Sequence, residues 1–331
     1  MSLSVDIEKK LGAFHLRSQF EAPDETMALL GASGCGKSMT LKCIAGIVTP
    51  DRGRIVLGGR VLFDSEKKIN LPPQQRRVGY LFQQYALFPN MSVEQNILCG
   101  IRSGDKAEKR RVLAEKIRMF RLEGLEKKHP AQLSGGQQQR VAIARILCSE
   151  PEAILLDEPF SALDSYLKWK LEIELADLLA TFNGPILWVS HDRDECYRNC
   201  RSVCVMEDGR TGEVTPMDEM IRHPGSVSAA RLAGCKNFFA AEARDGKVYL
   251  PEWNVALPLA GMENTFTTIG IPDNAVTMSE NGTMSCTVCR MILGVEENIL
   301  LLRPEGSAEG APMLRITVGH ESDLPRGHPS A

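Results

Sequence analysis

The residues best suited to chemistry in this 331-residue sequence lie in one short stretch, Gly31-Ala32-Ser33-Gly34-Cys35-Gly36-Lys37-Ser38. Its glycines let the backbone curl so that several N–H groups point inward at an anion. Lys37 can reach the β- and γ-phosphates of a nucleotide, and the hydroxyl of Ser38 can ligate Mg²⁺. The stretch therefore predicts a phosphate-binding loop.

The segments on either side of this loop support the prediction. Met27-Ala28-Leu29-Leu30 is an apolar run typical of a buried strand, and Met39–Ala45 has the pattern of a helix. A helix that begins at the loop adds its partial positive charge to the same place. Because strand, glycine-rich loop and helix follow one another, a chance glycine loop is the weaker interpretation. We include Met39 with the binding loop.

Four further polar residues, Gln83, Asp157, Glu158 and His191, come directly after short apolar runs. Such runs alternating with helices predict an α/β fold with a parallel, helix-covered sheet, whose strands hold ligands at their carboxyl ends. Asp157 would hold Mg²⁺ beside the phosphate loop, and Glu158 would accept a proton from an attacking water. The alternatives are an exposed carboxylate pair and, for His191, a histidine of the core.

A second glycine-containing run is Leu133-Ser134-Gly135-Gly136-Gln137-Gln138-Gln139-Arg140. It resembles the signature of the ATP-binding cassette (ABC) family. The other motifs of that family occur in the family's order: the phosphate loop, Gln83, the signature, Asp157-Glu158, Ser161-Ala162-Leu163-Asp164 and His191. The resemblance covers about residues 1–235 and implies the P-loop NTPase fold of an ABC cassette.

The resemblance also implies ATP and Mg²⁺ as cofactors and a role for each matched residue. Ser38, Gln83 and Asp157 would contact the metal, Glu158 would be the catalytic base, and His191 would bond the γ-phosphate. Gln83 would also contact the attacking water. The remaining nucleotide contacts would come from the phosphate loop and from Ser134, Gly135, Gly136, Gln137 and Asp164.

The signature has a second implication. Its serine and glycines stand at a predicted helix N-terminus, which is a favourable place for an anion. In the family they close over the γ-phosphate that a second copy holds, so the resemblance implies a head-to-tail homodimer. One position departs from the family pattern, because Leu11 stands where an aromatic residue normally stacks on adenine. Phe14 is the candidate substitute.

Charge and hydropathy narrow the class of protein. The 39 basic and 42 acidic residues give a net charge of −3, which predicts no nucleic-acid partner. No apolar run approaches the roughly 20 residues of a membrane span, and Met1–Lys10 does not have the pattern of a signal peptide. We therefore expect a cytosolic chain with reduced cysteines. Cys286 and Cys289 form a lone C-x-x-C pair, for which a metal or redox role and simple burial both stay open.

The pattern of the chain predicts two domains. The cassette comprises residues 1–235, with a helical subdomain at about 85–150. Residues 236–320 are broken by Gly, Pro and Asn into short strand-like runs, the first of them Phe238–Ala243, which predicts a small all-β, barrel-like domain. The resemblance to ABC cassettes implies that this domain is of the TOBE/MOP type. The polar, Pro-rich tail 321–331 is predicted to be disordered.

Several segments resemble the importers within the ABC family. Residues 84–93 resemble the stretch that grips a permease helix, and a cassette followed by a small β-domain is typical of importers for sugars, polyamines, iron, sulfate or molybdate. Residues 59–73, 76–83 and 234–237 are closest to the molybdate-importer ATPases. The resemblance implies a peripheral subunit on the cytoplasmic face of the membrane, which contacts permease subunits directly and an extracytoplasmic substrate-binding protein indirectly. The alternatives are another transported substrate, a non-transport cassette ATPase, and a second domain that binds oxyanion itself.

Overall fold

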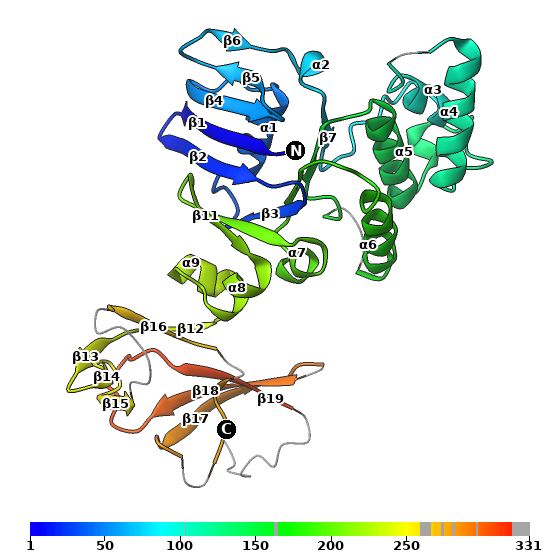
Figure 1. Cartoon of the computed structure of the whole chain (residues 1–331). Helices are drawn as coiled ribbons and strands as arrows, with labels where there is room; N and C mark the ends of the chain where they lie inside the picture. The colour runs from blue at the N-terminus through cyan, green and yellow to red at the C-terminus, as the bar shows by residue number, and fades with distance from the viewer. Residues whose placement is uncertain are drawn as a thin grey trace. The chain divides into compact units, whose positions relative to one another are not determined.

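The computed structural model describes residues 1–102, 104–161, 165–258, 266–272, 275–279, 282–295 and 297–319, without the side chains of 165–167. The chain forms two compact units, Met1–His223 and Pro224–Ala331 (Figure 1). The boundary between the two units follows His223, whereas the sequence analysis places the end of the cassette at residue 235. Asp164 and the tail 321–331 lie outside the described residues.

The first unit is built on one eleven-stranded sheet with the order β6-β5-β4-β1-β2-β11-β10-β3-β9-β8-β7. Its strands are β1 (Leu3–Leu11), β2 (Phe14–Ala22), β3 (Thr26–Gly31), β4 (Arg52–Leu57), β5 (Arg60–Asp64), β6 (Ile69–Asn70), β7 (Val78–Leu81), β8 (Ala153–Asp157), β9 (Ile186–Val189), β10 (Ser202–Glu207) and β11 (Arg210–Pro216). Strands β7, β8, β9, β3 and β10 run parallel to one another. Strand β10 pairs antiparallel with β11, which in turn pairs parallel with β2.

The expectation of a parallel sheet is correct only for this half. Strands β6, β5, β4, β1 and β2 pair antiparallel. Short turns explain the difference for the pairs β1–β2, β4–β5 and β5–β6, because a parallel pair needs a long crossover that a few residues cannot supply. One such turn contains Gly12 at φ 61°, and another contains Gly58 and Gly59 at φ 53° and 81°.

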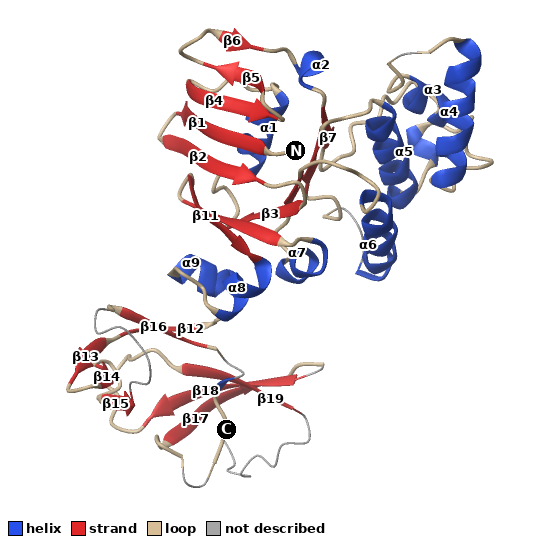
Figure 2. Cartoon of the chain, viewed as in Figure 1, coloured by secondary structure: helices blue, strands red, loops and turns tan. Residues whose placement is uncertain are grey.

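The helices of the first unit are α1 (Lys37–Ala45), α2 (Pro73–Arg76), α3 (Val93–Leu98), α4 (Lys106–Met119), α5 (Gly135–Cys148), α6 (Ser165–Leu179), α7 (Arg193–Asn199) and α8 (Met217–Arg222), with a 3-10 turn at Pro130–Gln132. Helices α3, α4 and α5 form a group beside the sheet (Figure 2). Pro73 is the first residue of α2, since proline suits the first turn of a helix. Among the described residues, no helix is long and apolar enough to cross a membrane.

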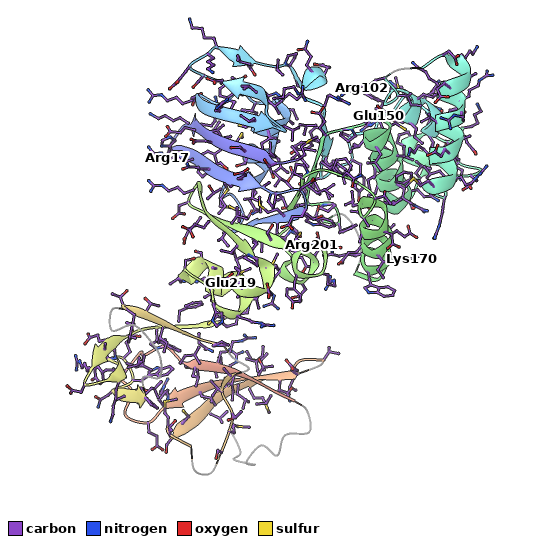
Figure 3. All side chains as sticks on the ribbon, in the orientation of Figure 1. Arg17, Arg102, Glu150, Lys170, Arg201 and Glu219 are labelled. Atoms are coloured by element: carbon purple, nitrogen blue, oxygen red, sulfur yellow. The ribbon has the colours of Figure 1, made fainter. Side chains whose placement is uncertain are left out.

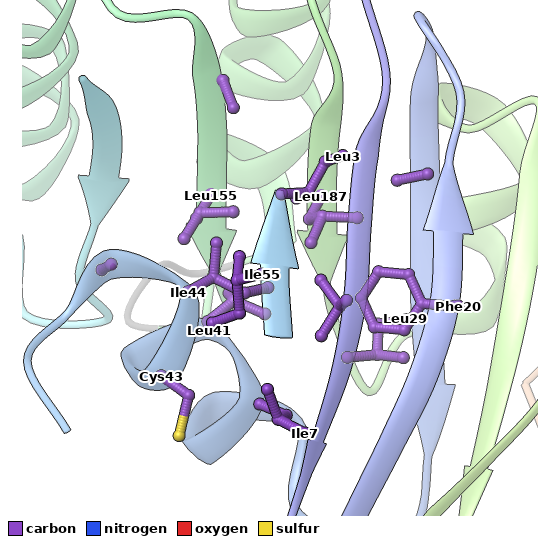
Figure 4. Packing of buried hydrophobic residues seen from close by; sticks show 14 of the residues in the cluster. Leu3, Ile7, Phe20, Leu29, Leu41, Cys43, Ile44, Ile55, Leu155 and Leu187 are labelled. Atoms are coloured by element: carbon purple, nitrogen blue, oxygen red, sulfur yellow. The ribbon is translucent and has the colours of Figure 1, made fainter. Parts of the chain in front are cut away.

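Packing of α1 against the sheet builds the main core. Leu41 and Ile44 of α1 are fully buried and pack among strand residues such as Ile55, Leu155 and Leu187 (Figure 4). Charged side chains, for example Arg17, Lys170 and Glu219, lie on the surface (Figure 3). The core therefore fixes the N-terminus of α1 relative to the ends of β3, β8 and β9.

The second unit comprises α9 (Val227–Leu232) and strands β12 (Asn237–Ala240), β13 (Glu242–Arg244), β14 (Lys247–Leu250), β15 (Val255–Pro258), β16 (Thr268–Ile271), β17 (Cys286–Ile292), β18 (Glu297–Pro304) and β19 (Leu314–Gly319). They form three small sheets, β12-β16, β13-β14-β15 and β17-β18-β19, around a core that includes Trp253, Leu300 and Ile316. The prediction of a small all-β domain is confirmed. The single strand expected at 238–243 is two strands that belong to different sheets.

Candidate active site

The phosphate loop joins the end of β3 to the start of α1, as its position in the sequence predicts. Gly36 precedes the helix with φ 114°, and a Cβ atom built there would lie 2.8 Å from Cδ1 of Leu16. Gly34 has φ 81°. Both conformations favour glycine, because a side chain strains a backbone at positive φ. No side chain caps α1, so no side chain satisfies the first N–H groups of this helix.

Lys37 folds back over this loop. Its Nζ donates to the carbonyl oxygens of Gly31 at 2.7 Å and Ala32 at 2.9 Å, and it lies 3.8 Å from Sγ of Cys35. The residue is only 6% exposed, and none of these acceptors is a carboxylate. A buried ammonium group with neutral acceptors retains a charge that an anion can neutralise. The geometry therefore suits a phosphate group at the loop.

Ser38 and Asp157 meet where α1 begins and β8 ends. Oγ of Ser38 donates to Oδ1 of Asp157 at 2.7 Å, and Asp157 is buried. A hydroxyl and a carboxylate side by side are hard oxygen ligands of the kind that hold Mg²⁺ together with substrate phosphates. Among the described residues there is no cluster of three or more acidic, His or Cys side chains for a metal. A Mg²⁺ site that uses nucleotide phosphates needs only one or two carboxylates, so the residues fit the ion.

Sequence reasoning did not identify Tyr80, whose hydroxyl donates to Oδ2 of Asp157 at 2.7 Å. Burial, followed by this bond to a carboxylate, raises the pKa of Tyr80 above its ordinary value, so the hydroxyl stays protonated. The position of Tyr80 on a short apolar strand, one residue before its end, was the only local signal. The bond itself depends on how two distant strands pair.

Glu158, Gln83 and His191 converge on one carboxylate oxygen. Nε2 of Gln83 donates to Oε2 of Glu158 at 3.2 Å, and Nδ1 of His191 lies 3.6 Å from the same oxygen. Glu158 has φ 49°, a conformation uncommon for residues other than glycine, and its backbone N–H bonds the carbonyl of Val189 at 2.9 Å. The side chain of His191 is 67% exposed, so it can turn toward a ligand. Three predicted site residues are thus brought together.

A network of charged side chains holds the loop that carries His191. Asp192 caps α7 by accepting from the backbone N–H groups of Asp194 and Glu195. Nζ of Lys168, on α6, bonds Oδ2 of Asp192 at 2.5 Å and Oε2 of the buried Glu195 at 2.9 Å. Burial favours the neutral forms, but these bonds outweigh it, raising the pKa of Lys168 and lowering that of Asp192.

The signature serine begins α5, as predicted. Ser134 and Gln137 form a reciprocal capping box, with Ser134 N–H donating to Oε1 of Gln137 at 3.0 Å and Gln137 N–H donating to Oγ of Ser134 at 3.3 Å. Ser134 is exposed, whereas Gly136 is buried where a Cβ would lie 2.7 Å from Leu171. Among the described residues, no hydrogen bond joins this turn to the phosphate loop of the same chain.

Phe14 lies beside the phosphate loop. Its ring is half-buried, packs against the main core, and would come within 3.2 Å of a Cβ at Gly36. Leu11 is its partner across the β1–β2 hairpin and is 38% exposed. An adenine contact by Phe14 stays a prediction, as does the role of Asp164, which lies outside the described part of the chain. Cys286 is half-buried and Cys289 is exposed, both as free thiols.

Comparison with known proteins agrees with this geometry. The family model described as ABC transporter matches residues 19–161. The chain is 39% identical over 223 residues to the molybdenum import ATP-binding protein of Paramagnetospirillum magneticum. The aligned region is 67% of this chain and 61% of that protein. The chain is also 36% identical over 268 residues to the sulfate/thiosulfate import ATP-binding protein of Methylococcus capsulatus. That aligned region is 78% of this chain and 75% of that protein.

A solved structure is also similar. A dimeric ATP-binding cassette in a post-hydrolysis state, bound to ADP and Pi, matches 66% of this chain and 99% of its own length with a TM-score of 0.54 and 28% identity. These similarities are consistent with the mixed sheet and with the phosphate loop at the end of β3. The chain belongs to the ABC transporter family.

Proposed function

We propose that this chain is the ATP-hydrolysing subunit of an importer, and that it acts as a homodimer to drive uptake of molybdate or a related oxyanion. One observation carries the ATPase part of the proposal. The end of β8 presents Asp157 to the Ser38 hydroxyl at 2.7 Å and, one residue later, Glu158 to Gln83 and His191. Metal ligands and a candidate base thus stand next to one another at the phosphate loop.

The proposed chemistry assigns one task to each group. Lys37 and the loop N–H groups bind the phosphates of ATP, and Ser38 and Asp157 hold Mg²⁺, which neutralises phosphate charge when bound. Oε2 of Glu158 accepts a proton from the attacking water. Gln83 and His191, which already contact that oxygen, orient the water and the γ-phosphate by single hydrogen bonds.

The proposed homodimer completes this site. Ser134 is exposed at the N-terminus of α5, where N–H groups and the helix dipole favour an anion. In the described part of the chain, no hydrogen bond joins this turn to its own phosphate loop. The anion that the turn caps is therefore the one bound by the phosphate loop of a second copy. The similar cassette of known structure is a dimer. Each ATP would then lie between two copies.

Mixed dimers test this arrangement. Lys37→Ala disables the phosphate loop, and Ser134→Arg blocks the exposed signature turn, so each variant alone should be nearly inactive. A head-to-tail dimer that contains one copy of each places both defects in one site and leaves the other site intact. Mixing the two variants should therefore restore Mg-dependent ATP hydrolysis. Unchanged inactivity in dimers shown to be mixed would contradict the proposal.

Residues 84–93 support a permease partner. Phe88 is 49% exposed and Met91 37% exposed, and these two residues form the proposed docking surface. Arg145 lies over the Phe88 ring at 5.3 Å, and Asn96 fixes the backbone of Phe88 through bonds of 2.9 Å and 3.2 Å. Tyr85 is buried and lies outside this surface. An apolar pair held on a rigid loop suits contact with a helix of a membrane protein.

The proposed substrate rests on similarity alone. Segments 59–73, 76–83 and 234–237 resemble molybdate importers, and the relative from Paramagnetospirillum magneticum is a molybdenum import ATP-binding protein. We further propose a location on the cytoplasmic face of the membrane, an indirect partner in an extracytoplasmic binding protein, and a regulatory role for the all-β unit.

The decisive experiment on the substrate is uptake of radiolabelled molybdate, sulfate and spermidine into cells that carry or lack the gene. Loss of molybdate uptake alone supports the proposal, and loss of another substrate alone would replace molybdate with that substrate.

A further inference from the structure

We propose that Tyr80 is a positioning residue for the Mg²⁺ site, because its hydroxyl holds the Asp157 carboxylate in a fixed orientation. This inference rests on the Mg-ATP site proposed above. The Tyr80 hydroxyl donates to Oδ2 of Asp157 at 2.7 Å, while Oδ1 accepts from Oγ of Ser38 at 2.7 Å. Oδ2 is thus held by a tyrosine of the sheet, and Oδ1 is bonded to the serine that follows Lys37 at the start of α1.

The pairing of two strands explains how this bond arises. Strands β7 and β8 run parallel with Tyr80 opposite Leu155. Side chains alternate along a strand, so Asp157 points to the same face as Leu155, one step further along. A tyrosine is long enough to reach this diagonal neighbour. That face is the one that α1 covers, so Tyr80, Asp157 and Ser38 meet on the same side of the sheet.

The surroundings leave the Tyr80 hydroxyl little freedom. The residue is 9% exposed, and its ring packs against Phe82 with centroids 4.3 Å apart. A buried tyrosine hydroxyl needs a polar partner, and in the described structure Asp157 is the one that it has. Groups that orient a metal ligand from behind affect metal affinity strongly. Tyr80 has the geometry of such a group.

The chain also contains a matched control. Tyr85 is likewise buried, at 4% exposure, but its hydroxyl has no hydrogen-bond partner among the described residues. Tyr80→Phe and Tyr85→Phe therefore each remove one buried hydroxyl from neighbouring positions. The two substitutions differ in whether the hydroxyl bonds the Asp157 carboxylate.

The test measures binding rather than turnover. A fluorescent ATP analogue is titrated into the full chain in EDTA and at rising Mg²⁺ concentrations. For Tyr80→Phe we expect the Mg²⁺ concentration that gives half of the metal-dependent gain in affinity to rise on the order of tenfold. Affinity in EDTA should be unchanged, and Tyr85→Phe should match the parent protein in both conditions.

Other outcomes would overturn the inference. An unchanged Mg²⁺ requirement in Tyr80→Phe contradicts it, and so does an equal loss of affinity in EDTA, which indicates a merely structural role. If Tyr80→Phe does not fold, Tyr80→Met provides the same test, since methionine fills a similar volume and packs well on Phe82. A parent protein without any Mg²⁺-dependent nucleotide binding would refute the proposed function itself.

Discussion

Lys37 and Asp157 in the first unit and Asn237 in the second are all almost fully buried, yet different kinds of partner hold them. Nζ of Lys37 has only neutral acceptors, and the side-chain partners of the Asp157 carboxylate in the described structure are the neutral hydroxyls of Ser38 and Tyr80. The Asn237 amide donates to the carbonyls of Ile271 and Arg315 and accepts from the Arg315 N–H, at 2.8–2.9 Å.

This difference separates binding from folding. A buried charge without a charged partner lowers stability unless a ligand completes it. The Asn237 amide uses both of its N–H groups and its oxygen on backbone, and so joins β12, β16 and β19. The burial of Lys37 and Asp157 therefore indicates a binding site, and the burial of Asn237 indicates a structural role. The following predictions can break or sharpen this distinction.

The largest expected effect is on nucleotide binding by Lys37→Ala. Loss of a charge-assisted contact to phosphate should weaken ATP affinity on the order of 100-fold. The melting temperature without nucleotide should stay the same or rise, because the substitution removes an uncompensated buried charge. Calorimetric titration and thermal denaturation measure the two quantities. A strong loss of stability with unchanged affinity would reverse the assignment of Lys37.

Asn237→Ala should produce the opposite pattern. It leaves two carbonyls and one N–H without their partner, which costs about 3 kcal/mol in the free energy of unfolding of the second unit. ATP affinity should not change. Hydrogen exchange of the amides in β18 reports on this unit locally, and Lys236→Ala, at an exposed neighbouring position, is the control. Weaker ATP binding by Asn237→Ala would contradict a purely structural role.

The smallest expected effect concerns acid stability around His191. The folded pKa of Asp192 is lowered from 3.8, so its stabilising contribution is present above that pH and is lost as the pH falls through the folded value. Lys168→Met removes the cation, so this loss should begin at a higher pH and amount to at most about 1 kcal/mol, since both side chains are partly exposed. Melting temperatures from pH 3 to 7 measure it, with exposed Lys170→Met as control. Identical pH profiles would argue against the network.

Local signals in the sequence predicted local structure well. Helix α5 begins at the signature, as predicted, because the Ser134 and Gln137 capping box marks its start. Similar signals were overlooked at Ser92 before α3 and at Asp192 before α7, since both helices are short. Residues 238–243 read as one strand because neither of the two strands is long enough to show its own pattern.

Features that depend on distant pairing could not be predicted from the sequence. The mixed sheet order follows from how hairpins join the parallel strands, and nothing local encodes it. The Tyr80 bond to Asp157 requires the register of β7 on β8, in which Val78 pairs with Ala153. By contrast, the convergence of Gln83, Glu158 and His191 was predictable, because carboxyl ends of parallel strands meet at one edge of a sheet.

The most direct test of the central claim is single-turnover ATP hydrolysis by Glu158→Gln, with dimerisation followed by light scattering. We expect ATP affinity within about twofold of the parent, a hydrolysis rate lower by roughly 10²- to 10⁴-fold, and a dimer that persists while ATP is bound. Glu123→Gln, at an exposed position, should behave like the parent. Hydrolysis by Glu158→Gln at the parental rate would contradict the account, because the carboxylate that Gln83 and His191 contact would then not be the base.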